Sequence, residues 1–271
     1  MSISLHYVVR RCPDNLEKGW EALERFDGDI NQAFHRMELC DKNGVFPLSG
    51  SVIRTKNDIL RRVDKVKRRY PHLLEVYRKR NGKKELFDLL IARQELLGMF
   101  TNISLSVHPR IKQAWKIQFE LFGTFWNTDV KNKYCCMFPE IEKAMGGVAN
   151  AWHFTPRSGI YLVNPPYTEE AIEKSLALVK SSIINKNSGR LRFVIVIPVW
   201  DKKTREESGL YDNYDMPAIN QFLNEKFVQY HKVFSHFPFY DYLKRKDVKM
   251  PGVYIHFIVA EKHRPPNWRE L

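Results

Sequence analysis

The sequence is poor in cysteine, and its cysteines form no pattern that would hold a metal ion or a disulfide framework. The four are Cys12, Cys40, Cys135 and Cys136. The last two are adjacent and cannot easily pair with each other, no C-x-x-C pair is present, and the nine histidines do not supply a zinc-type spacing. We therefore expect reduced thiols, no bound metal, and an intracellular protein of the nucleus or cytoplasm.

Long apolar runs are also missing. No stretch approaches the roughly 20 apolar residues that a bilayer-spanning helix needs, and residues 1–6 lack the basic-then-apolar pattern of a signal peptide. Hydrophobic residues make up 44% of the chain and charged residues 28%, which is typical of a folded globular protein. We expect no membrane partner and a self-contained monomer, with a partner subunit as the open alternative.

The first third of the chain has the apolar spacing of helices. The segment from Thr55 opens with a capping-box variant and places its apolar residues on one face, with arginines opposite. Pro71 is expected to kink or end that helix, and Asn81-Gly82 is a stop signal for the next one. A further helix is expected over residues 86–97, whereas residues 44–50 are expected to form a loop.

After about residue 110 the spacing becomes that of an α/β fold. Thr168 can cap a helix whose first turn carries Glu169 and Glu170, which suits the helix dipole. The third of four expected strands is nearly all apolar, as a central parallel strand covered on both faces should be. The expected strands are residues 116–122, 160–163, 191–197 and 253–260. We predict a helical domain over residues 1–110 and an α/β domain over residues 111–271.

The positive charge of the chain is concentrated in one segment. Residues 51–84 hold thirteen Lys or Arg against three acidic residues, a local net of +10 out of +13 for the whole chain. Such a block is typical of a surface that binds a phosphate backbone. A solvated helix face and an anionic membrane surface are the alternatives. The residues predicted to guide a nucleic acid are Arg54, Arg61, Arg62, Arg68 and Arg69.

The tetrapeptide Asn164-Pro165-Pro166-Tyr167 follows a short apolar run and is the most informative motif. An exocyclic amine such as adenine N6 needs two hydrogen-bond acceptors beside a methyl donor, and the Asn164 side-chain oxygen and the Pro165 carbonyl can supply them. The two prolines stiffen the turn, and Tyr167 offers a ring on which a base can stack. A strand-to-helix turn that merely contains two prolines is the structural alternative.

Together with other segments, this motif resembles a known family, the cap-specific adenosine N6-methyltransferases, also called phosphorylated CTD-interacting factors. The segments occur in the family's order and approximate spacing: residues 119–124 (FELFGT), 136–140 (CMFPE), 158–159, 164–167 (NPPY) and 193–200 (FVIVIPVW). The likeness covers about residues 115 to 260. Tyr167 stands where the family's animal members have phenylalanine, and we expect a minimal form without their WW domain, such as a viral or protist protein.

The resemblance implies a Rossmann-like methyltransferase core with an N-terminal α-helical domain. It also implies S-adenosylmethionine as donor and capped RNA beginning with adenosine as acceptor. The product would be N6-methylated adenosine, usually already 2′-O-methylated, next to the 7-methylguanosine cap.

The donor site is expected around the end of the first strand. Gly123 would let the backbone approach the donor, and Glu120 would meet its ammonium group. Phe119 and Glu140 are expected to line the same site, Glu140 by taking ribose hydroxyls. Gly146-Gly147 is an alternative glycine turn. Trp200 is expected to line the base site, although a tryptophan of the hydrophobic core would give the same sequence pattern.

We expect direct in-line transfer to N6, with Asn164, Pro165, Pro166 and Tyr167 as the catalytic residues and with no metal or covalent intermediate. The motif alone does not dictate the acceptor. A DNA adenine N6-methyltransferase, a methyltransferase for a glutamine amide in protein, and a non-catalytic RNA-binding protein that retains the fold remain the alternatives.

Overall fold

The computed structural model describes residues 47–48, 51–52, 56–96, 100, 105–129, 133–208, 215–248 and 253–262. The chain divides into two compact units, Met1–Ser104 and Leu105–Leu271. The boundary expected between residues 110 and 111 would fall inside helix α7 (Pro109–Ala114), so the second unit begins earlier than predicted. The reason is that strand β3 (Leu105–Val107) pairs with a strand of the second unit, β9 (Phe239–Asp241).

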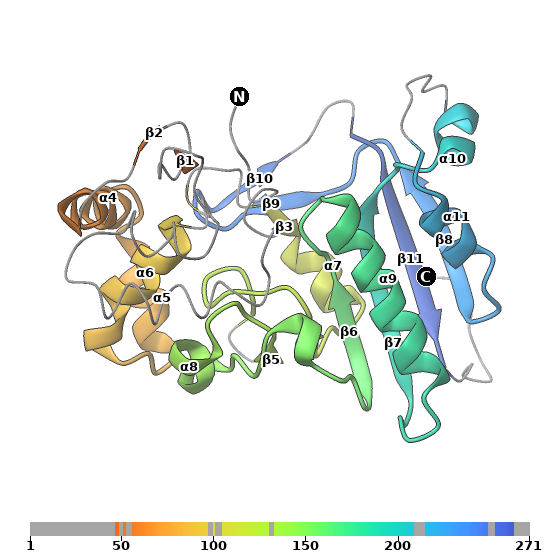
Figure 1. Ribbon diagram of the computed structural model, residues 1–271, viewed down its shortest axis with the longest axis horizontal. Helices are drawn as coiled ribbons and strands as arrows, with labels where there is room; N and C mark the ends of the chain where they lie inside the picture. The colour runs from red at the N-terminus through yellow and green to blue at the C-terminus, as the bar shows by residue number, and fades with distance from the viewer. Residues whose placement is uncertain are drawn as a thin grey trace. The chain divides into compact units, whose positions relative to one another are not determined.

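The described part of the first unit is mostly helical, as expected (Figure 1). A short antiparallel pair of strands, β1 and β2, lies where residues 44–50 were expected to form a loop. Helix α4 ends before Pro71 and α5 begins after it, which confirms the predicted break. The elements are β1 (Pro47–Leu48), β2 (Ser51–Val52), α4 (Lys56–Arg69), α5 (His72–Lys79), the 3₁₀ turn η1 (Lys84–Leu86) and α6 (Phe87–Leu96).

Tyr77 belongs to the core among the described residues of this unit. Its side chain is fully buried, and its ring contacts the Phe87 ring with centroids 5.0 Å apart. A Cβ atom on Gly82 would lie 2.4 Å from the Tyr77 ring, so only glycine fits there. Asn81 has a φ of 60°, a left-handed conformation that asparagine tolerates. The predicted stop signal for α5 is therefore confirmed by packing as well as by backbone geometry.

The second unit is built around a six-stranded sheet with the order β5-β4-β6-β7-β11-β8. Its strands are β4 (Phe119–Glu120), β5 (Lys133–Tyr134), β6 (Gly159–Val163), β7 (Leu191–Pro198), β8 (Val228–Phe234) and β11 (Ile255–Glu261). Neighbours from β5 to β7 pair in parallel, and β11 is antiparallel to both β7 and β8. Five strands thus run one way and β11 the other. The fold is mixed α/β with a mostly parallel sheet.

Three of the four expected strands are confirmed as β6, β7 and β11. The fourth, expected over residues 116–122, shortens to β4, because Lys116 takes a φ of 52° and bends the chain just before it. Strands β5 and β8 were not predicted. β5 has two residues, and β8 lies at the edge of the sheet with a mostly exposed, polar sequence, so neither shows the apolar alternation of a strand.

Both faces of the large sheet are covered. Phe193, Ile195 and Ile197 of β7 pack on helix α9 (Glu169–Ile184) and helix α11 (Pro217–Leu223), whereas Val194 and Val196 pack on the other face. α9 begins at the predicted cap, where the Thr168 hydroxyl accepts the Ala171 N–H at 3.1 Å. Figure 1 shows α9 lying along β6 and β7, which it connects. β6, α9 and β7 form the predicted βαβ unit.

A smaller sheet completes the second unit. Strands β3, β9 and β10 (Lys246–Val248) form an antiparallel sheet with β9 in the centre. β9 follows the carboxyl end of β8 after residues 235–238, so this sheet continues from the carboxyl edge of the large one. The remaining short elements are α8 (Pro139–Glu142), the 3₁₀ turns η2 (Lys143–Met145) and η3 (Ala151–His153), and α10 (Lys202–Glu207).

Candidate functional site

The order of the strands defines where a ligand site should lie. After β4 the chain forms β5 on one side of β4 and then crosses to form β6 on its other side. Such a reversal between neighbouring parallel strands opens a crevice at their carboxyl ends, where α/β proteins bind ligands. Phe119 pairs with Tyr161 and Glu120 with Leu162, and the Leu121 N–H donates to the Leu162 carbonyl at 2.9 Å. The FELFGT and NPPY segments therefore meet at the same edge.

The Asn164 turn follows β6 directly and leads into α9. Tyr167 donates its hydroxyl to Asn164 Oδ1 at 3.3 Å, and the Thr168 N–H donates to the Pro166 carbonyl at 2.8 Å. Burial raises the pKa of Tyr167, so its hydroxyl stays protonated and remains a donor. An amide oxygen has two lone pairs, so Asn164 Oδ1 retains one acceptor position. Neither of these two hydrogen bonds uses the Pro165 carbonyl oxygen as its acceptor.

Trp200 lies beside this turn, as expected for a residue after β7. The Trp200 and Tyr167 rings meet edge to face, with centroids 6.5 Å apart. The next residue, Asp201, is fully buried and caps α10 by accepting the Thr204 N–H at 2.8 Å. The residue that follows Trp200 therefore anchors this turn to the start of α10.

Asp201 also begins a series of hydrogen bonds that runs through the buried His256 to His231 on the edge strand β8. Its Oδ2 lies 2.6 Å from His256 Nε2, and His256 Nδ1 lies 2.8 Å from His231 Nε2. Burial alone would raise the pKa of Asp201, but the hydrogen bonds from His256 and Thr204 outweigh it and lower the pKa to about 2. Desolvation, helped by the neighbouring His256, lowers the pKa of His231 to about 4. The series of hydrogen bonds thus has an ionised Asp201 at one end and a neutral His231 at the other, with His256 between them.

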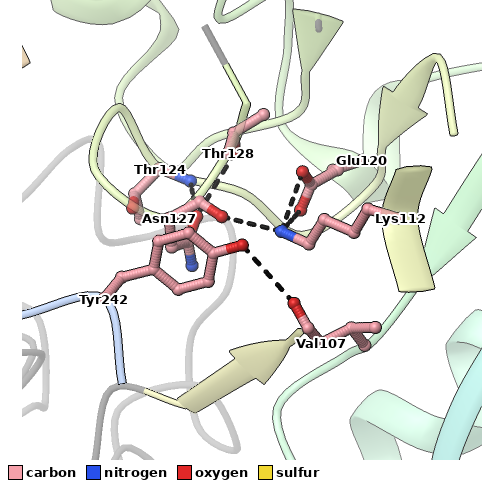
Figure 2. Close-up of polar contacts among 7 residues, drawn as sticks. All are labelled: Val107, Lys112, Glu120, Thr124, Asn127, Thr128 and Tyr242. Carbon is pink, nitrogen blue, oxygen red and sulfur yellow. Dashed lines mark hydrogen bonds and ion pairs between the residues drawn. The ribbon is translucent and has the colours of Figure 1, made fainter. Parts of the chain in front are cut away.

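The carboxylate of Glu120 is engaged by a lysine that the sequence did not point to. Lys112 Nζ on α7 lies 3.0 and 2.8 Å from the two Glu120 oxygens and 2.8 Å from the Asn127 carbonyl oxygen (Figure 2). Lys112 is 4% exposed and Glu120 1%. The Lys112 ammonium also faces the Tyr242 ring at 4.8 Å. Glu120 therefore presents a neutralised pair at the end of β4 and not a bare carboxylate.

The turn after β4 is held by further polar contacts. The Asn127 side-chain oxygen accepts the Thr124 N–H at 2.7 Å, and Glu142 on α8 accepts the Phe125 N–H at 3.0 Å. A Cβ atom on Gly123 would lie 2.6 Å from the Thr128 hydroxyl, so protein packing already requires this glycine. The Thr124 hydroxyl is buried and has no hydrogen-bond partner among the described residues.

The other predicted residues are placed as follows. Phe119 stacks on Phe154 with centroids 4.8 Å apart, within the core face that α9 covers. Glu140 is the second residue of α8, and its side chain lies outside the described residues, so its role stays a prediction. Gly146 ends η2 with a φ of 99°, and Gly147 packs against Cys136 and Glu142. Backbone geometry and packing therefore explain the presence of both glycines without a bound donor.

The predicted basic residues belong to the first unit. Arg61, Arg68 and Arg69 are exposed on α4, whereas Arg62 pairs with the buried Glu95 of α6 at 3.0 Å. Arg54 lies outside the described residues.

The described residues include no helix that is long and apolar enough to cross a bilayer. In the same part of the chain, no group of three or more His, Cys, Asp or Glu side chains is arranged to hold a metal ion.

Comparison with known proteins gives the same family as the sequence motifs. The model of one family, described as Phosphorylated CTD interacting factor 1 WW domain, matches residues 53–216, which is more than half of the chain. The chain belongs to this family. The matched residues include α4 to α6 of the first unit and β4, β6, α9 and β7 of the second, together with the Asn164 turn.

Two curated relatives carry the same name, mRNA (2′-O-methyladenosine-N(6)-)-methyltransferase. The mouse protein is 25% identical and the human protein 24% identical over 103 residues. The match covers 38% of this chain and 14% of each relative, so this member of the family corresponds to a small part of their length.

Sequence reasoning missed several polar residues of the site. Lys112 lies in a short helix with no recognisable motif, and the partner of its ammonium, Glu120, follows eight residues later with a bend between them. His256 left a signal, since it is a histidine inside an otherwise apolar strand. A polar residue in such a position needs a buried partner, and Asp201 is that partner.

We expect Lys112→Met to destabilise the protein strongly, because it leaves the Glu120 carboxylate buried without its partner. The free energy of unfolding should fall by about 3 to 5 kcal/mol. Lys202→Met is the matched control, since Lys202 pairs with Glu206 on the surface at 3.9 Å and should cost less than about 1 kcal/mol. Chemical denaturation followed by circular dichroism measures both. Equal costs for the two variants would contradict the structural role of the Lys112–Glu120 pair.

Acid should destabilise the fold through His231. Its pKa is about 4 in the folded protein against an ordinary value of 6.5, so between these values the unfolded chain binds a proton that the folded chain does not. Stability is therefore lost as the pH falls from 6.5 to 4. We expect His231→Gln to flatten the fall of the thermal midpoint in this window, with the exposed His236→Gln as control. An unchanged pH profile in His231→Gln would refute this assignment.

Proposed function

We propose that this chain is an S-adenosylmethionine-dependent methyltransferase that acts on the N6 amine of adenosine in mRNA. The proposed acceptor is the first transcribed (2′-O-methyl)adenosine next to the 7-methylguanosine cap. The observation that carries this proposal is the Asn164-Pro165-Pro166-Tyr167 turn at the reversal point of a mostly parallel sheet, with Trp200 beside Tyr167. The name of the mouse and human relatives supports the same reaction, methyl transfer to adenosine N6 in mRNA.

The proposed fold is a Rossmann-like methyltransferase core, Leu105–Leu271, preceded by a helical, basic unit. The parallel strands β4, β6 and β7 with the crossover helix α9 support it. We also propose that the protein is a monomer, that it acts on capped RNA, and that it does so inside the cell.

S-Adenosylmethionine would supply an electrophilic methyl group on sulfur. The residues around the end of β4 fit such a polar ligand, because the Thr124 hydroxyl, next to the Gly123 turn, is buried and has no hydrogen-bond partner in the described part of the chain. Glu120, Gly123 and Phe119 would form the strand end of this site, and Glu140 would come from α8. Since Lys112 neutralises Glu120, the pair together, and not a lone carboxylate, would face the amino-acid end of the donor.

The acceptor amine would be held by the Asn164 turn. Asn164 Oδ1 and the Pro165 carbonyl would accept the two N–H bonds of adenine N6, which lets the nitrogen lone pair turn out of the ring plane toward the methyl group. The Tyr167 hydroxyl fixes the orientation of the Asn164 amide from its other side. The Tyr167 ring would stack on the adenine, worth about 1 to 3 kcal/mol, with Trp200 as the adjoining wall.

Most of the acceleration would come from holding the amine and the methyl group in line. Positive charge leaves sulfur and develops on the amine in the transition state, where two fixed acceptor oxygens stabilise it. The methylated ammonium is acidic enough to release its proton to solvent, so no strong general base is required.

Asn164→Ala should abolish turnover while the fold and donor binding persist. We expect a loss of about 100-fold or more, the size of effect seen when one pre-organised hydrogen-bond partner of a transition state is removed. Turnover is measured by mass spectrometry of nucleosides, and donor binding by calorimetry. Tyr167→Phe is the comparison variant. It removes the hydrogen bond to Asn164 Oδ1 but keeps Asn164 and the stacking ring, so it should lose much less activity than Asn164→Ala. Full turnover in Asn164→Ala would disprove the catalytic assignment.

Helix α4 is proposed to guide the RNA through its exposed arginines. Arg61→Glu combined with Arg68→Glu should weaken RNA binding and reduce the slope of log affinity against log salt by about 1.4, since each phosphate contact on a single strand contributes about 0.7. Fluorescence anisotropy at several salt concentrations gives both values. Unaltered affinity and slope would remove α4 from the RNA interface.

A further inference from the structure

A second basic surface lies in the other unit, at the tip of the β9–β10 hairpin. Lys244, Arg245 and Lys246 follow one another along the chain, and all three side chains are exposed. Lys244 pairs with Asp241 at 3.4 Å, whereas Arg245 and Lys246 form no ion pair within the described part of the chain. The exposed Asp247 is engaged by His108 at 3.0 Å. The hairpin therefore carries three cations against two carboxylates, Asp241 and Asp247, and its net charge is positive.

Buried residues of the hairpin hold its tip in place. Asp241 is buried, and its Oδ1 accepts the Leu243 N–H at 3.0 Å and the Lys244 N–H at 2.9 Å. Leu243 is buried as well, so an apolar side chain anchors the turn to the unit. Arg245 has a φ of 53°, a left-handed conformation in which glycine is the unstrained residue. The chain thus places a long cation where local geometry favours glycine.

The hairpin is connected to the candidate donor site by direct contacts. Tyr242 lies next to Leu243 in the turn, and its hydroxyl donates to the Val107 carbonyl at 3.4 Å. Its ring faces Lys112, which pairs with Glu120 at the end of β4 (Figure 2). The basic tip therefore belongs to the same edge of the unit as the turns after β4 and β6.

We propose that the β9–β10 hairpin binds the phosphate backbone of the single-stranded RNA substrate. Closely spaced Lys and Arg side chains on a fixed turn match successive phosphates, and they release counterions when they bind. The identity of the nucleic acid rests on the proposed function. The hairpin would hold the RNA body downstream of the adenosine while the Asn164 turn holds the base.

The test uses the full chain and a labelled single-stranded capped RNA without methyl donor, titrated at several salt concentrations. Arg245→Glu with Lys246→Glu should lower affinity at low salt by about 10-fold or more and reduce the salt slope by about 1.4. The matched control reverses one lysine and one arginine at the opposite edge, Lys186→Glu with Arg190→Glu, both exposed between α9 and β7. Equal effects of the two double variants would overturn the proposal.

Arg245→Gly separates binding from folding. Because glycine relieves the left-handed strain, the thermal midpoint should stay the same or rise, while the salt slope should fall by about 0.7. An unchanged slope in this variant would also overturn the proposal. The readout is binding alone, so a failure to find methyl transfer on any acceptor would contradict the proposed function and leave the hairpin result standing.

Discussion

The parallel pairing of β4, β6 and β7 is the constraint on which the rest of the second unit depends. Its register, Phe119 with Tyr161 and Tyr161 with Phe193, brings the ends of three strands to one edge although they are far apart in sequence. The turns that leave these strands carry Gly123, Asn164 and Trp200. A slip of one residue in β6 would turn its buried side chains to the other face and move Asn164 away from both neighbours.

Buried polar pairs hold these turns in place. Lys112 and Glu120 lie at the end of β4, and Asp201 and His256 lie at the end of β7. Each pair costs desolvation energy that an apolar core would not, so its value lies in fixing a particular arrangement. The first pair links α7 to the turn after β4, and the second anchors the turn that places Trp200 against Tyr167. The aromatic and amide groups proposed to hold the base are thereby set before any ligand arrives.

Local patterns in the sequence predicted what local chemistry determines. The break at Pro71, the stop at Asn81-Gly82, the Thr168 cap and the apolar strand β7 all follow from neighbouring residues. β5 and β8 could not be found this way, because one has two residues and the other is an exposed edge strand. The Asn164 turn was expected after a buried strand, and it follows β6 directly, whereas its catalytic role stays a prediction. Lys112, Asp201 with His256, and the basic hairpin depend on contacts between distant segments, which no short pattern records.

The most direct test of the account is turnover with S-adenosylmethionine on matched acceptors, digested to nucleosides and measured by mass spectrometry. The acceptors are 7-methylguanosine-capped RNA starting with adenosine, the same RNA uncapped, single-stranded DNA and duplex DNA. The account predicts methyl gain on the first adenosine of the capped RNA. Gain on DNA or on internal adenosine would contradict the cap assignment, and no gain on any acceptor, from a protein that still binds RNA, would contradict the proposed methyltransferase activity itself.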